Sequence, residues 1–134
     1  MRRPKRIFFL VTLMGIALLA AGALALRQAL DPFNKNAFSV SAWATATPES
    51  RATMARDALH FVPAGITESQ VIALLGKPDH VLLPSSDAGS SHVLGARAYT
   101  YELGNWSMHG MDAAFLYVHL DGSGRVIKSD IYGY

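Results

Sequence analysis

Hydrophobic and polar residues follow three different patterns along this chain, and each pattern occupies its own region. A continuous apolar run covers residues 7–26. Between residues 47 and 79, apolar residues recur at steps of three and four, which is typical of amphipathic helices. From residue 97 to residue 132, apolar and polar residues alternate, which is typical of strands with one buried face. The predicted order is a long apolar segment, two helices and then strands.

The second of the two helices, within residues 64–79, is specified most completely. Thr67 is expected at its N-cap, and Gln70 follows three residues later, as in a capping box. Gly76 is placed for the left-handed conformation that ends a helix, and Pro78 prevents its continuation. The apolar stripe of this helix consists of Val71, Leu74 and Leu75.

The first helix begins at Thr47–Pro48, where threonine suits the N-cap and proline suits the first helical position. We expect this helix to end near Phe61. Its apolar face consists of Met54, Ala55, Ala58, Leu59 and Val62.

Three strands are expected, at residues 97–103, 113–120 and 125–132. Residues 121–124, with the sequence DGSG, predict a hairpin turn between the last two. A turn of two or four residues would direct Ile127 and Ile131 inward, which is our expectation. A three-residue turn would direct Val126 inward instead, because a slip of one residue reverses every side chain.

The expected fold class is therefore α+β. Two short helices pack on one face of a three-stranded antiparallel β-meander, and an N-terminal transmembrane helix precedes them.

Residues 7–26 are uncharged, and as a helix they would extend roughly 30 Å, the thickness of a bilayer core. The basic residues before this run outnumber those after it, which favours a cytoplasmic N-terminus. A cleaved signal peptide is the alternative, because residues 21–23 and 23–25 both match an A-x-A cleavage site. We favour an uncleaved anchor, since the run is longer than the usual signal core of about 7–15 residues.

The chain is thus divided into a membrane anchor or signal peptide at residues 1–26, a linker at 27–46 and a folded domain at 47–134. The linker shows no sustained period, but it carries Phe33, Phe38 and Trp43. A free tether does not need these aromatic side chains, so part of the linker is a candidate to lie against the domain.

Charge and composition exclude several classes of function. Four of the twelve Lys and Arg residues lie within the first six positions. From residue 27 onward, eight basic residues face ten acidic ones, a formal charge of 8 − 10 = −2. This gives no support for a nucleic-acid partner. The chain has no cysteine, which excludes disulfides, thiolate metal sites and a lipid-modified cysteine.

No catalytic or metal-binding pattern emerges from the sequence. The five histidines do not form an H-x-x-x-H or H-E-x-x-H spacing. They are His60, His80, His92, His109 and His119. We therefore expect no enzyme activity, no cofactor and no metal.

The strand at residues 113–120 supplies the one candidate site. If Leu116, Val118 and Leu120 face the helices, Phe115, Tyr117 and His119 point to the opposite, open face of the sheet. Aromatic side chains on such a face are a candidate surface for a partner. The alternative is that the aromatic residues of the linker fold across this face and cover it.

Three blocks of the sequence together resemble a known family. They are RATMARDALHFVPAGITESQVIALLGKPD (residues 51–79), YTYELG (99–104) and LYVHLDGSGRV (116–126). Their order resembles the SmpA/OmlA, or BamE-like, family of bacterial envelope proteins. The resemblance implies two helices on a three-stranded antiparallel sheet and a non-enzymatic role beside other envelope proteins and lipid. Members of that type are lipoproteins, so we carry over the fold and no functional residue.

The expected function is a membrane-anchored envelope protein whose periplasmic domain binds a protein or lipid partner in envelope or outer-membrane assembly or maintenance. It would cross the bacterial inner membrane once, with its N-terminus in the cytoplasm. The alternative is a soluble periplasmic domain, released after cleavage, that acts as an inhibitor or holds a ligand.

Overall fold

The chain divides into two compact units, residues 1–31 and residues 32–134. The computed structural model describes residues 4–85, 92–106 and 112–133. In the first unit it describes the side chains of residues 11–26, Leu30 and Asp31. Each unit is considered by itself.

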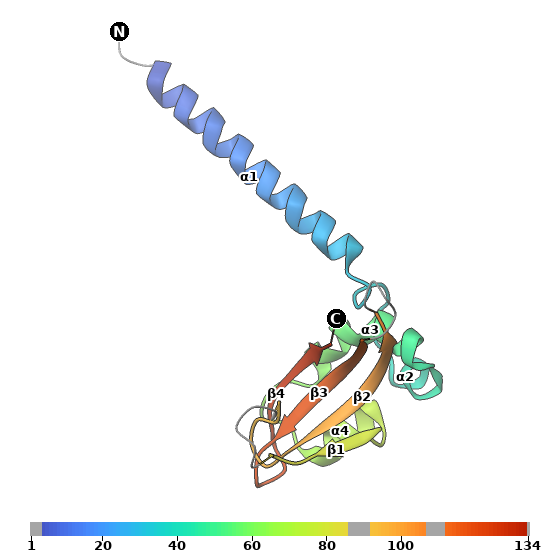
Figure 1. Cartoon of the computed structure of the whole chain (residues 1–134). Helices are drawn as coiled ribbons and strands as arrows, with labels where there is room; N and C mark the ends of the chain where they lie inside the picture. Colours follow the sequence, from blue (N-terminus) through green and yellow to red (C-terminus); the bar gives the residue numbers. More distant parts are fainter. Residues whose placement is uncertain (1–3, 86–91, 107–111, 134) are drawn as a thin grey trace. The chain divides into compact units, whose positions relative to one another are not determined.

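From residue 4 onward, the first unit forms one helix, α1 (Pro4–Leu30), of 27 residues (Figure 1). Its described side chains are exposed, and they include eight large hydrophobic ones between residues 11 and 26. The helical conformation expected for residues 7–26 is confirmed. Within the part of the chain that the structure describes, no helix has both the length and the apolar character needed to cross a membrane.

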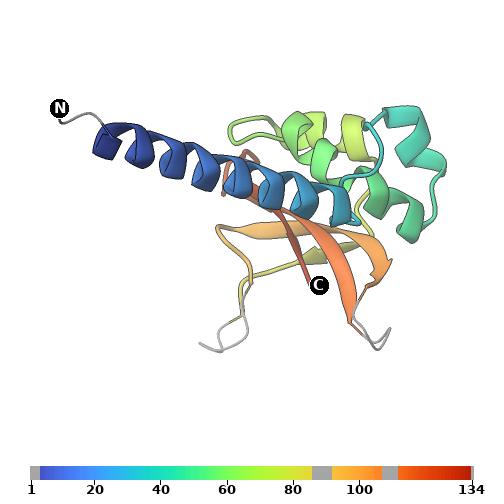
Figure 2. The same ribbon diagram turned by 90° about the horizontal axis from the view of Figure 1, so that it is seen from above.

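Over its described residues, the second unit is an α+β domain with three helices and a four-stranded antiparallel sheet in the order β1-β2-β3-β4. The helices are α2 (Val40–Thr45), α3 (Pro48–Phe61) and α4 (Glu68–Leu75). The strands are β1 (His80–Leu82), β2 (Arg97–Asn105), β3 (Ala113–Leu120) and β4 (Val126–Tyr132). Figure 2 shows these three helices together on one side of the sheet.

The expected α+β class with short helices on an antiparallel sheet is confirmed for this unit, but the strand count of three is wrong. The fourth strand, β1, pairs with β2 and places Val81 opposite Tyr99. A strand of three residues is too short to show an alternating pattern in the sequence. Only the pairing with β2 defines it.

Both expected helices form with their predicted caps. The Thr47 side chain accepts a hydrogen bond from the Ser50 N–H, and Pro48 is the first residue of α3. At α4, the Thr67 Oγ1 accepts from the Gln70 N–H at 3.3 Å, and the Thr67 N–H donates to the Gln70 side chain at 2.8 Å. These two bonds are the predicted capping box.

Gly76 ends α4 with φ 75° and ψ −170°. The positive φ agrees with the prediction, but the ψ angle lies outside the left-handed helical region. Essentially only glycine adopts this combination of angles. The Tyr101 hydroxyl donates to the Gly76 carbonyl at 3.0 Å, which attaches the end of the helix to β2.

The hydrophobic core lies between the helices and the sheet. Strand β2 contributes alternate residues Tyr99, Tyr101 and Leu103, and β3 contributes Leu116, Val118 and Leu120. Helix α3 packs on β2 and β4, while α2 contacts both α3 and α4.

The register of β4 corrects one expectation. A bulge between His119 and Leu120 places Leu120 opposite Val126 and His119 opposite Lys128, so Ile127 is the extra residue. Val126 is therefore buried and Ile127 is 42% exposed. Ile131 packs against the core as expected. A bulge shifts the alternation by one residue, so a regular pattern predicts the wrong inward side chain.

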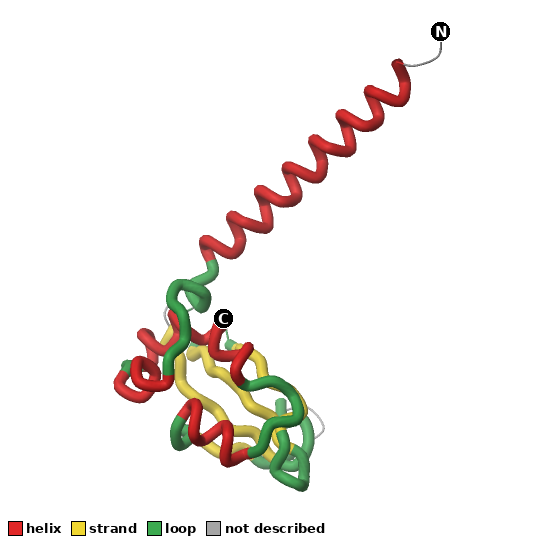
Figure 3. The backbone as a smooth tube through the Cα atoms, turned by 180° about the vertical axis from the view of Figure 1, so that it is seen from behind, coloured by secondary structure: helices red, strands yellow, loops and turns green. Residues whose placement is uncertain are grey.

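The interpretation of residues 27–46 as a linker is also corrected. Residues 27–30 belong to α1, and residues 32–46 belong to the domain (Figure 3). Phe33 and Trp43 are fully buried, and the Trp43 indole N–H donates to the Leu75 carbonyl at 3.1 Å. The burial of these aromatic rings fixes the segment, although its sequence shows no period.

Candidate partner-binding surface

The face of the sheet opposite the helices carries a continuous set of side chains from neighbouring strands, which we call the open face. Three residues of β3 run along its middle: Phe115, Tyr117 and His119. The strand register places Glu102, Thr100 and Ala98 of β2 beside them on one side. On the other side it places Tyr132, Asp130 and Lys128 of β4.

On this face, the ring of Tyr117 contacts two other aromatic rings, those of Phe115 and Tyr132. The ring centroid of Tyr117 lies 5.0 Å from that of Tyr132 and 6.4 Å from that of Phe115, both in edge-on contacts. All three side chains are half-buried. An aromatic group of this kind offers a partner a large apolar area that needs little further ordering.

Burial raises the pKa of the Tyr117 hydroxyl, and the nearby Tyr132 and Asp130 raise it further. The hydroxyl therefore stays protonated at neutral pH. It can donate one hydrogen bond and accept others at the edge of an otherwise apolar patch.

The structure places Phe115, Tyr117 and His119 on one face of the sheet, as the alternating pattern predicts. Their side chains differ in solvent exposure. Phe115 and Tyr117 are half-buried, whereas His119 is fully buried. His119, which we predicted to be part of an exposed surface, is therefore covered.

The aromatic residues of segment 32–46 pack on the helix side of the sheet. Trp43 makes an edge-on contact with the core residue Tyr101 at 6.2 Å and another with Phe38 at 5.8 Å. Phe33 contacts Trp106 at 5.7 Å and belongs to the same core. The alternative that these residues cover the open face is therefore wrong.

His119 is instead held by residues 92–96, which precede β2 and which we call the strap. The Leu94 N–H donates to His119 Nδ1 at 3.1 Å. The other ring nitrogen, Nε2, faces Asp130 Oδ1 at 3.4 Å. Because Nδ1 accepts a hydrogen bond, the proton of the neutral imidazole is on Nε2.

Burial lowers the pKa of His119, and the nearby Lys128 lowers it further, while Asp130 acts in the opposite direction. Lys128 and Asp130 also form an ion pair with each other. At neutral pH, the ring is therefore uncharged and suited to accept the Leu94 hydrogen bond.

Gly95 allows the strap to lie close to the sheet. Its φ is +84°, and a Cβ atom there would lie 2.6 Å from the Leu120 carbonyl oxygen. Ala96 N–H donates to the same carbonyl at 2.8 Å. The His92 ring also lies 5.7 Å from the ring of Tyr132. Residues 84–91, which precede the strap, are small and polar and show no period, so the sequence alone did not predict the role of the strap.

Two polar clusters of the domain have a structural explanation. The Glu68 carboxylate at the start of α4 accepts hydrogen bonds from Arg97 and Tyr99 of β2. Arg51 of α3 pairs with Asp79 at 3.1 Å, and the same Asp79 oxygen accepts from the Glu102 N–H at 2.8 Å. Each cluster connects a helix to β2 and leaves its charges paired.

Among residues 4–85, 92–106 and 112–133, no group of three or more His, Asp or Glu side chains could hold a metal ion. His80 pairs with Glu102 at 3.0 Å on the surface. His109 lies outside the described residues.

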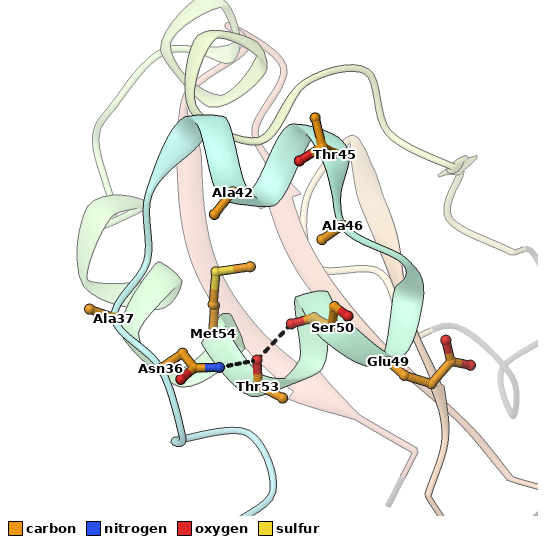
Figure 4. A pocket seen from close by; sticks show the side chains of 9 residues that line it. All are labelled: Asn36, Ala37, Ala42, Thr45, Ala46, Glu49, Ser50, Thr53 and Met54. Carbon is orange, nitrogen blue, oxygen red and sulfur yellow. Dashed lines mark hydrogen bonds between the residues drawn. The ribbon is translucent and has the colours of Figure 1, made fainter.

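A shallow depression of about 550 Å³ lies between α2 and the first half of α3 (Figure 4). It is lined by small side chains and a few polar ones: Asn36, Ala37, Ala42, Thr45, Ala46, Glu49, Ser50, Thr53 and Met54. The Asn36 amide already donates to Thr53, and the Thr53 hydroxyl donates to the Ser50 carbonyl. These hydrogen-bonding groups are engaged with one another, so the open face remains the stronger candidate.

No protein-family model, curated protein or solved structure matches this chain.

Proposed function

We propose that this chain is a membrane-anchored protein of the bacterial envelope whose domain, residues 32–134, binds a protein or lipid partner through the open face. The observation that carries this proposal is the contact between the half-buried rings of Phe115, Tyr117 and Tyr132 on the side of the sheet away from the helices. The proposed role is binding, without catalysis or a cofactor.

The anchor in this proposal is α1. Large apolar side chains are exposed all along its described part, and a helix that is apolar on every side requires an apolar environment. Four basic residues precede the uncharged run, which favours a cytoplasmic N-terminus and a periplasmic domain. The proposed single pass through the inner membrane uses the whole uncharged run, residues 7–26, of which the structure describes the side chains of residues 11–26.

The resemblance to the SmpA/OmlA, or BamE-like, family supports a role in envelope assembly or maintenance. The order of α3, α4, β2, β3 and β4 agrees with the order of elements that this resemblance implies. The absence of cysteine leaves a membrane helix, rather than a lipid, as the proposed anchor.

Site-specific photocross-linking tests the proposed surface. We would replace Tyr117 with the photoreactive amino acid p-benzoylphenylalanine and irradiate intact cells that produce the full chain. We expect a discrete adduct, with the mass increase of a protein or of a lipid, because the ring of residue 117 lies in the centre of the open face. The same replacement at Ile72 is the control, since Ile72 is exposed on α4.

The double variant Phe115→Ser, Tyr117→Ser provides the second measurement, with the photoreactive residue placed at position 132. We expect the adduct from this position to be lost while the circular dichroism spectrum of the chain is retained. Equal adducts from positions 117 and 72, or an undiminished adduct in the double variant, would show that the open face is not the binding surface.

A further inference from the structure

The open face carries an internal hydrogen bond that depends on one titratable side chain. Leu94 of the strap donates its N–H to Nδ1 of His119, which is fully buried. An imidazolium carries a proton on both nitrogens and cannot accept this bond. A proton added to His119 therefore removes this hydrogen bond, and the strap is then attached to the sheet only near its ends, by the Ala96 N–H bond to the Leu120 carbonyl and the contact of His92 with Tyr132.

We propose that His119 is a pH-sensitive latch: it holds the strap, residues 92–96, on the open face at neutral pH and releases it when the imidazole takes up a proton. The inference rests on the proposed function, because release of the strap would enlarge the partner surface formed by the rings of Phe115, Tyr117 and Tyr132. The domain would then bind its partner more strongly in an acidified compartment.

The groups that face His119 determine the direction of this response. Strand β4 contributes Lys128, which lies opposite His119 in the register, and Asp130, whose carboxylate faces Nε2. On β3, the ring of Tyr117 is stacked on the imidazole with centroids 5.7 Å apart. Strand β2 contributes the uncharged Ala98. From the strap, His92 contacts Tyr132.

Because burial lowers the pKa of His119 while the strap is closed, the open state binds the proton more readily. Closure is therefore fully favoured above the ordinary imidazole pKa of about 6.5. It is lost as the pH falls through the lowered pKa of the buried ring. Asp130 acts against this lowering and Lys128 adds to it, so removing either charge changes the pH of release in a known direction.

The closure of the strap can be measured without a partner, by NMR of the full chain in detergent micelles. We expect the protection factor of the Leu94 amide to fall about tenfold or more between about pH 7.5 and pH 4.5, together with titration of the His119 ring. The core amide of Val118 should remain protected over the same range, since the sheet itself stays folded.

Substitutions distinguish the latch from general acid unfolding. His119→Asn keeps an acceptor near the position of Nδ1 but does not titrate, so Leu94 protection should become independent of pH. Asp130→Asn should move the midpoint to lower pH, and Lys128→Gln should move it to higher pH. His60→Asn, at an exposed position on α3, is the matched control and should change nothing.

The latch is contradicted if Leu94 loses protection with the same pH dependence in His119→Asn, or if the two charge substitutions leave the midpoint unchanged. If His119→Asn does not fold, the opposite shifts of the two charge variants still decide the question. These measurements involve no partner, so the latch can fail while photocross-linking at position 117 succeeds, and the reverse.

Discussion

Trp43 shows how one residue joins parts of the domain that are distant in the sequence. Its ring is fully buried, contacts Phe38 and Tyr101 edge-on, and lies under the guanidinium of Arg51 at 5.7 Å. Its N–H donates to the carbonyl at the last residue of α4, Leu75. A single side chain therefore attaches segment 32–46 to α3, α4 and β2.

We expect Trp43→Phe to lower the free energy of unfolding by about 1–3 kcal/mol, because it leaves the Leu75 carbonyl without its buried donor. Trp43→Ala should cost about 3–5 kcal/mol, since it also leaves a cavity. Urea unfolding of the full chain in detergent micelles, followed by circular dichroism, measures both. Ala44→Ser, at an exposed position of the same helix, should change stability by less than about 0.5 kcal/mol. Equal stability of Trp43→Phe and the wild type would mean that the hydrogen bond contributes nothing.

At the scale of elements, α4 depends on its ends. With 8 residues, it is shorter than an isolated helix that is stable in water. The capping box satisfies two backbone donors at its start, and Gly76 ends it in a conformation that other residues avoid. Its buried residues Val71 and Leu75 then attach it to the core.

Thr67→Ala should therefore destabilise the domain by about 1 kcal/mol. Because the Gln70 side chain bonds back to the Thr67 N–H, the two residues form one unit. The double variant Thr67→Ala, Gln70→Ala should cost less than the sum of the two single variants, as measured by the shift of the urea midpoint. Ser69→Ala, at an exposed position of the first turn, is the control. Strictly additive costs would show that the two bonds act independently.

At the scale of the whole molecule, the two units differ in the polarity of the side chains that they expose. The described side chains of α1 are exposed and almost all apolar. The domain, residues 32–134, buries an apolar core and has seven basic and nine acidic residues, a formal charge of 7 − 9 = −2. This division is the physical basis for the proposal that one unit resides in a membrane and the other outside it.

Ile16→Arg tests the membrane role of α1. A charged side chain near the centre of a spanning helix costs about 2.5–3.5 kcal/mol of insertion free energy. We therefore expect this variant to appear in the carbonate-soluble fraction, while the wild type and Ile16→Leu remain in the membrane pellet. N-terminal sequencing of the pellet gives an independent result, because a mature chain that begins at Leu24 or Leu26 would contradict an uncleaved anchor.

The local elements of this protein could be predicted from its sequence because their signals are local. Helix periodicity and caps indicated α3 and α4, including the capping box at Thr67 and Gln70. Alternation indicated β2, β3 and β4, and it placed Phe115, Tyr117 and His119 on one face. Each of these signals arises between residues that are within a few positions of one another.

Features that depend on distant contacts were decided only by the tertiary structure. Strand β1 exists because it pairs with β2, and the burial of Phe33 and Trp43 makes a segment without a period part of the domain. The bulge at Ile127 reversed the predicted inward residue. His119 is covered because the strap lies over it, with Gly95 allowing the close approach. The physical reason is the same throughout: the burial and hydrogen bonding of a side chain depend on neighbours that the local pattern does not contain.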